Sequence, residues 1–138
     1  MRVAVVFFSG QKRDKLMGLA KAIARGVGSQ GNQVDTFDWA RDSNVKLTIY
    51  QYVVLGAEPI GTFGGKIPES VRTFLASSGT VAGRRSYAFV SKATFGAAKS
   101  LSALMKCMEG EGMLIKSSDI LRSPAEAEEI GKRLHVST

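Results

Sequence analysis

Residues 2–27 join a continuous apolar run to an amphipathic helix, and this pairing constrains the fold more than any other part of the chain. Residues 3–8 are apolar at every position, which is typical of a strand buried on both faces near the centre of a parallel sheet. A polar turn follows, and apolar residues then recur at helical spacing: Leu16, Leu19, Ala20, Ile23 and Val27. A strand, a short turn and a helix form the first half of a βαβ unit.

The turn between this strand and this helix is the first candidate ligand site. Free backbone N–H groups and the positive end of the helix dipole meet at a helix N-terminus, which makes it an anion site. The turn contains Ser9, Gly10, Gln11, Lys12, Arg13 and Asp14. This combination is not a standard phosphate motif.

Length and composition predict one soluble domain over residues 1–138. A chain of 138 residues buries about 65–70% of the surface that its unfolded form exposes. Its 44% hydrophobic and 22% charged residues are ordinary for a globular protein. No apolar run approaches the roughly 20 residues that span a bilayer, and residues 3–8 are too short for a signal peptide. We therefore expect no membrane span.

A single cysteine and a single histidine limit the chemistry. Cys107 excludes an internal disulfide framework and suits a reducing cytoplasm, the expected location. Together with His135 it cannot supply the ligands of a structural zinc site. Because Cys107 lies in an apolar helical stretch, we expect it to pack in the core.

The net charge of +7 is concentrated in two segments. Residues 1–33 contain six basic residues against Asp14 alone, and residues 84–106 contain five basic residues and no acid. Both segments surround predicted strand-to-helix turns. Three interpretations stay open: a solvated basic surface, an acidic protein partner, or an anionic ligand. Nucleic acid is not expected as a partner, because no nucleic-acid motif accompanies the charge.

Strands and helices alternate along the rest of the chain. The patterns predict further strands over residues 33–37, 52–55, 86–91 and 113–116, with helices after Pro68, through residues 101–108 and from Pro124. This alternation predicts a three-layer α/β/α domain with a five-stranded parallel sheet of order 2-1-3-4-5. Ligands bind such sheets at the carboxyl ends of the strands, so residues 9–14, 57–65 and 91–96 should surround one crevice.

Four nucleotide or phosphate chemistries are excluded at the first turn. A dinucleotide fingerprint requires three spaced glycines, of which Gly10 alone is present, and no Walker A motif occurs. A phosphoacceptor receiver domain requires acidic residues after the first strand and an aspartate after the third. Low-molecular-weight phosphatases require a cysteine in this turn. Neither requirement is met.

Four segments resemble the flavodoxin family, and together they span nearly the whole chain: residues 3–9 (VAVVFFS), 22–26 (AIARG), 52–56 (YVVLG) and 67–75 (IPESVRTFL). The resemblance implies a flavodoxin-like fold that binds FMN, with the phosphate on the first turn and the ring between the loops after strands three and four. In this sequence the ring loops contain Thr62, Phe63, Gly64 and Gly65, and Thr94, Phe95 and Gly96.

The resemblance assigns two kinds of contact to the ring loops. Phe63 and Phe95 would stack on the flavin, although each could instead cap the core. Thr62, Gly64 and Gly65 would offer backbone N–H groups to the carbonyl oxygens of the ring. Trp39 is on the wrong loop for stacking and is expected to pack at the surface.

The first turn departs from the family, because the hydroxyl-rich Thr-Gly-Asn-Thr is absent and Ser9 alone matches it. One interpretation has Gln11, Lys12 and Arg13 bind the phosphate, since arginine grips phosphate in a bidentate fork. The other has Asp14 cap the helix and take the backbone N–H groups itself. Both interpretations stay open at the level of sequence.

Three classes of function follow from these patterns. The first is an FMN-dependent electron-transfer protein, for which a basic surface predicts an acidic redox partner and a raised flavin potential. The second is a small NAD(P)H:quinone or flavin reductase. The third is a flavin-free binding module on the same scaffold. No general acid–base pair is assigned, and Glu58 either lines the crevice or is an exposed loop carboxylate beside Pro59.

Overall fold

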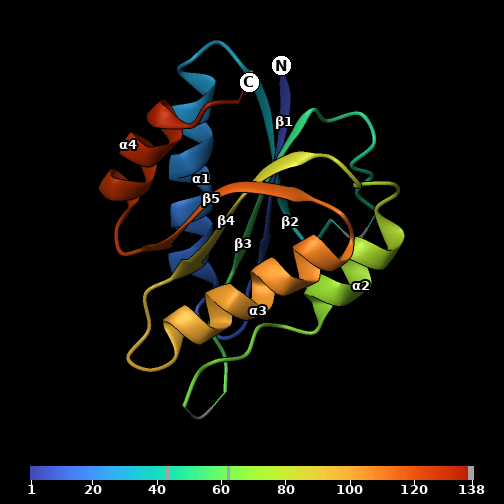
Figure 1. Ribbon diagram of the computed structural model, residues 1–138. Coiled ribbons are helices and arrows are strands. Elements are labelled where there is room, and N and C mark those ends of the chain that lie inside the picture. The colour runs from blue at the N-terminus through green and yellow to red at the C-terminus, as the bar shows by residue number, and fades with distance from the viewer. Residues whose placement is uncertain (43, 62, 137–138) are drawn as a thin grey trace.

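The computed structural model describes residues 1–42, 44–61 and 63–136. Within these residues the elements in chain order are β1 (Arg2–Phe8), α1 (Arg13–Gly28), β2 (Gln33–Asp38), β3 (Tyr52–Ala57), α2 (Ser70–Ser77), β4 (Arg85–Ser91), α3 (Ala97–Gly110), β5 (Leu114–Leu121) and α4 (Pro124–Arg133). Helices α1 and α4 cover one face of the sheet and α2 and α3 cover the other (Figure 1). The three-layer architecture is as expected from the sequence.

The strands form one parallel sheet in the order β2-β1-β3-β4-β5, which confirms the predicted topology. Strand β2 lies on one side of β1, and β3, β4 and β5 follow on the other side, so the strand order reverses between β1 and β3. In their register Phe8 lies opposite Ala57, so both strands end at the same level. The loops that follow these two strands are therefore neighbours.

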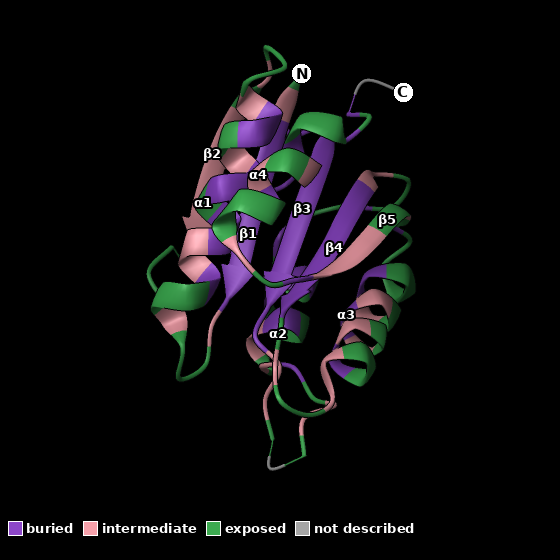
Figure 2. Ribbon diagram, turned by 90° about the vertical axis from the view of Figure 1, so that its left-hand side faces the viewer, coloured by how far each residue is buried: buried purple, intermediate pink, exposed green. Residues whose placement is uncertain are grey.

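Burial of the sheet decreases toward its edges (Figure 2). Every residue of β3 is buried, and in β1 and β4 the first residue alone is half-exposed. Strand β5 extends to Leu121, well beyond the predicted residues 113–116. Its residues 116–119 are polar, which an edge strand permits, and this polarity hid the continuation of the strand from the sequence pattern. The pairing with β4 and the hydrogen bond from the Tyr87 hydroxyl to Asp119 hold this part of the strand.

A close approach of glycines joins α1 to α4. A Cβ on Gly26 would lie 2.7 Å from the backbone nitrogen of Lys132 and 2.8 Å from Cα of Gly131. A Cβ on Gly131 would in turn meet Val27 at 3.1 Å. The two backbones pack against one another without side chains between them, which seals the core on this face of the sheet.

The single tryptophan and the single cysteine both pack against the core on the other face. Trp39 is half-buried, with its ring centroid 5.0 Å from that of Phe74 in an edge-on contact. Cys107 is half-buried beside the same cluster. The half-buried position of Trp39 agrees with the surface packing expected from the sequence, whereas Cys107 packs against the core without being fully buried in it.

None of the helices in the described parts of the chain combines the length and the apolar character required to cross a bilayer.

Candidate functional site

The carboxyl ends of the central strands border a cleft of about 540 Å³. It is lined by residues 10–12 after β1, residues 58–61 after β3 and residues 91–93 at the end of β4. Each belongs to one of the three segments that the sequence predicts around one crevice, but the lining does not include Ser9, Arg13, Asp14, residues 63–65 or residues 94–96. The cleft lies where the strand order reverses, which is the usual position of a ligand in an open parallel sheet.

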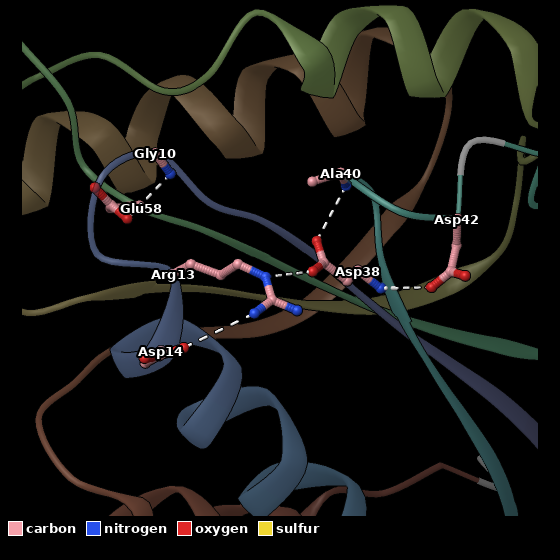
Figure 3. Close-up of polar contacts among 7 residues, drawn as sticks. All are labelled: Gly10, Arg13, Asp14, Asp38, Ala40, Asp42 and Glu58. Atoms are coloured by element: carbon pink, nitrogen blue, oxygen red, sulfur yellow. Dashed lines mark hydrogen bonds and ion pairs between the residues drawn. The ribbon is translucent and has the colours of Figure 1, made fainter.

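Glu58 occupies the anion cradle at the floor of this cleft. The backbone N–H groups of Gly10 and Lys12 donate to its Oε1 at 3.0 and 2.9 Å, and that of Gln11 donates to Oε2 at 3.0 Å. The residue is 6% exposed, so its carboxylate lies inside the turn and not on the surface (Figure 3). The crevice-lining interpretation of Glu58 is therefore the correct one.

The register of the sheet explains why Glu58 reaches the turn. Ala57 pairs with Phe8, and the Glu58 N–H donates to the Phe8 carbonyl at 3.1 Å, so its side chain starts beside Ser9 and Gly10. A Cβ on Gly10 would lie 2.9 Å from Oε2, which means that glycine leaves room for the carboxylate. The sequence signal was an acidic residue directly after β3, opposite a glycine turn.

Arg13 is held away from the cradle by Asp38. Its Nε donates to Asp38 Oδ2 at 2.6 Å, and Asp38 is in turn bound by the backbone N–H of Ala40 and donates its own N–H to Asp42 (Figure 3). The side chain of Asp14 is 93% exposed and lies 3.8 Å from Arg13. Neither side chain contacts the turn N–H groups, which belong to Glu58.

The start of α1 has no side-chain cap. Lys12 is the N-cap residue and makes no capping hydrogen bond, so the alternative interpretation, in which Asp14 caps the helix, is wrong: its carboxylate follows the turn and faces solvent. The Glu58 carboxylate takes over the function of a cap from a distant part of the chain. Gln11 and Lys12 keep their side chains exposed at the rim of the cleft, and Ser9 is half-buried.

The two ring loops touch each other through their backbones. Gly64 has a φ of +70°, and a Cβ there would collide with the Phe95 carbonyl oxygen. A Cβ on Gly96, which has a φ of +74°, would meet the Gly64 carbonyl carbon at 2.6 Å. Phe63 and Phe95 project outward, with exposed fractions of 78% and 61%. The core-capping alternative for these two rings is therefore excluded.

The backbone N–H groups assigned to the flavin carbonyl oxygens have partners inside the protein. Gly64 N–H donates to the Gly61 carbonyl at 3.1 Å, and Gly65 N–H donates to the Ser100 hydroxyl at 3.1 Å. Thr62 lies outside the described residues, and Thr94 is exposed beside Phe95. The flavin-contact roles of these residues stay a prediction.

The residues at this site fit the parts of FMN unequally. The cleft offers apolar walls at Pro59, Ile60 and Ala93, whereas the exposed rings of Phe63 and Phe95 are not part of its lining. The phosphate does not fit the cradle as it stands, because each of its three N–H groups already donates to Glu58. No set of three or more histidine, cysteine, aspartate or glutamate side chains in the described ranges is grouped to hold a metal ion.

The fold matches solved flavodoxin structures over nearly the whole chain. A flavodoxin from the domain Archaea superposes with a TM-score of 0.76 at 19% identity, covering 96% of this chain and 95% of that one. The two-electron reduced flavodoxin of Megasphaera elsdenii superposes with a TM-score of 0.72 at 18% identity, covering 96% of this chain and 99% of that one. A WrbA-like flavodoxin from Agrobacterium tumefaciens superposes with a TM-score of 0.65 at 15% identity, covering 96% of this chain and 93% of that one.

No family model and no curated protein matches the sequence. At identities this low the structural matches define the architecture. The protein is therefore flavodoxin-like in fold, with a cleft at the position where that fold binds its ligand.

Proposed function

We propose that the protein is an electron-transfer protein of flavodoxin type that binds a flavin, FMN by resemblance, in the cleft between residues 10–12, 58–61 and 91–93. The observation that carries this proposal is the position of the cleft at the strand-order reversal of a flavodoxin-like sheet. A bound flavin would supply one- and two-electron redox chemistry. The protein would supply position, exclusion of water and electrostatics.

The residues around the cleft suit different ends of a flavin. Phe63 and Phe95 are exposed, and each lies two residues beyond a segment that lines the cleft, so their rings would offer stacking surfaces to a flavin. Lys12 and Lys92 stand at the rim, and Lys15 Nζ donates to the Lys92 carbonyl at 2.8 Å, which fixes a cation there. These positive charges would stabilise the anionic reduced flavin and raise its potential.

A basic groove supports an acidic redox partner. It has a volume of about 460 Å³ and runs along α3 from the ring loop at Gly65, lined by Arg72, Lys99 and Lys106 and by no acidic residue. Because Gly65 belongs to one of the ring loops, an acidic partner in this groove would lie close to that loop. Complementary charge of this kind raises association rates and weakens with ionic strength. A cytoplasmic location agrees with the single, unpaired cysteine.

A titration of the purified protein with FMN, followed by flavin absorbance and fluorescence, tests the proposal. Saturable binding, and reduction of the bound flavin without NADPH turnover, would support an electron-transfer protein. NADPH oxidation with a quinone acceptor would instead identify the reductase alternative, which the WrbA-like match keeps open. Absence of binding of both FMN and riboflavin at high micromolar concentration would overturn both.

The second candidate is a flavin-free module that binds an acidic partner through its basic surface. The occupation of the cradle by Glu58 favours it, because the phosphate of FMN has no free backbone donors at the turn. A colourless protein that does not bind flavin but binds an acidic partner in a salt-dependent manner would identify this class.

A further inference from the structure

We propose that Glu58 determines ligand specificity at the cleft: its carboxylate substitutes for a ligand phosphate, so the site prefers a flavin with an unphosphorylated ribityl chain over FMN. This proposal rests on flavin binding at the cleft and assigns which flavin the cleft takes. The observation that carries it is the engagement of all three turn N–H groups by one buried carboxylate.

The geometry is that of an anion bound in its cradle. The three donor distances lie between 2.9 and 3.0 Å, and they come from three consecutive residues at the start of a helix, where the helix dipole adds to the attraction. Each N–H carries one hydrogen. A phosphate could bind there only by displacing Glu58, and it would then lie beside a buried carboxylate of like charge.

A second contact engages Arg13, one of the two cationic side chains that the turn offers to a phosphate. Arg13 is the one side chain of the turn with a guanidinium group, and Asp38 binds its Nε at 2.6 Å. The side chain of Asp38 is 8% exposed, so this ion pair is buried at its acidic end. Glu58 after β3 thus engages the backbone donors of the turn, and Asp38 at the end of β2 engages Arg13, which leaves Lys12 as the exposed cation of the turn.

The same arrangement suits a neutral, hydroxyl-rich chain. Oε1 of Glu58 accepts two N–H groups and Oε2 accepts one, so Oε2 keeps capacity to accept from a ligand hydroxyl. Glu58 also lines the cleft, which places this acceptor where a ligand can reach it. A ribityl hydroxyl would donate to Glu58, whereas a phosphate monoester would be repelled.

The test compares FMN with riboflavin on four proteins: wild type, Glu58→Ala, Glu58→Gln and Asp14→Asn. The readout is the ratio of the riboflavin Kd to the FMN Kd from fluorescence titrations. Both ligands carry the same ring, so the contribution of the ring to affinity cancels in this ratio. Asp14→Asn removes one negative charge from the first turn of the same helix without touching the cradle. It is the matched control for long-range charge.

We expect a ratio at or below one in the wild type and a rise of about tenfold or more in Glu58→Ala. The ratio should also rise in Glu58→Gln, because this substitution removes the charge and one acceptor while it keeps the shape of the side chain. The ratio in Asp14→Asn should stay within about twofold of the wild-type ratio, as expected for an exposed charge. A wild-type ratio of ten or more, or a ratio unchanged in both folded Glu58 variants, would overturn the proposal.

Binding of inorganic phosphate separates failure of this proposal from failure of flavin binding. Saturable shifts of the Gly10, Gln11 and Lys12 amide resonances in Glu58→Gln or Glu58→Ala, absent in the wild type, would support the role of Glu58 even if neither flavin binds. The same saturable shifts in the wild type would overturn it. If Glu58→Ala does not fold, Glu58→Gln alone decides both measurements.

Discussion

Arg13 at the start of α1 and Asp38 at the end of β2 form a hydrogen-bonded ion pair with an Nε–Oδ2 distance of 2.6 Å. The pair connects the first turn of a helix to the adjacent edge strand across the sheet terminus, and Asp38 also accepts the N–H of Ala40 at 3.0 Å. The contact orients Arg13 away from the ligand cleft and makes it a structural residue.

Replacement of Asp38 by asparagine should lower the free energy of unfolding by about 1–3 kcal/mol, because the buried acceptor loses its charge while Arg13 keeps its own. Asp14→Asn is the control: its side chain is 93% exposed, so its effect should be within about 0.5 kcal/mol. Chemical denaturation of the three proteins measures both values. Equal effects of the two substitutions would show that the Arg13–Asp38 contact contributes nothing.

Two glycines of the same helix should respond in opposite ways to alanine. Gly26→Ala should destabilise the fold by about 1–3 kcal/mol, because the new Cβ enters the backbone of α4 at Gly131 and Lys132. Gly18→Ala should stabilise it by about 0.5–1 kcal/mol, since its Cβ would find Pro124 Cγ at an ordinary 4.0 Å and alanine favours the helix. Thermal unfolding of the pair checks the sign. Similar melting temperatures would refute the close α1–α4 packing.

Alkaline pH should unfold the protein through its tyrosines. Burial raises the pKa of Tyr50 from 10.0 to about 12, with a further contribution from its hydrogen bond to Asp35, and burial raises the pKa of Tyr52 to about 12 against the opposing charge of Arg85. Burial also raises the pKa of Tyr87, which donates to Asp119. The unfolded chain therefore loses these protons first, so stability is full below pH 10 and falls between pH 10 and about 12.

The matched variant for this pH dependence is Tyr50→Phe, which keeps the ring and removes one titrating hydroxyl. Its free energy of unfolding should fall less steeply across the same alkaline range. Denaturation curves at several pH values, with tyrosinate absorbance recorded in parallel, measure both effects. Ionisation of all three tyrosines near pH 10 in a folded protein would contradict the prediction.

Substitution of Phe63 or Phe95 by serine should weaken flavin binding and leave the fold intact. The two side chains are 78% and 61% exposed, so their removal should change the free energy of unfolding by no more than about 0.5 kcal/mol. Loss of a stacking surface should raise the riboflavin Kd about two- to tenfold. Ile49→Ser is the control, because Ile49 is 50% exposed and lies in neither of the two ring loops. Unchanged affinity in both phenylalanine variants would remove the rings from the site.

Hydrophobic periodicity was sufficient to predict the order of the elements, the sheet order and the position of the cleft. The error at β5 has a physical cause: its polar residues Lys116 to Asp119 are acceptable at a half-exposed edge strand and are held by pairing with β4. Similarly, Asp14 has the residue type and nearly the position of a helix cap. Local sequence does not reveal that Glu58 already satisfies the same N–H groups.

The sequence by itself determined the scaffold, because alternating apolar strands and amphipathic helices of this length have few ways to bury their surfaces. It also determined that an anion cradle would form after β1. The tertiary structure decided what fills that cradle. Glu58 is 46–48 residues away from its three donors in the chain, and Asp38 is 25 residues from Arg13. Both contacts depend on the register of neighbouring strands, which brings the carboxylates to the turn.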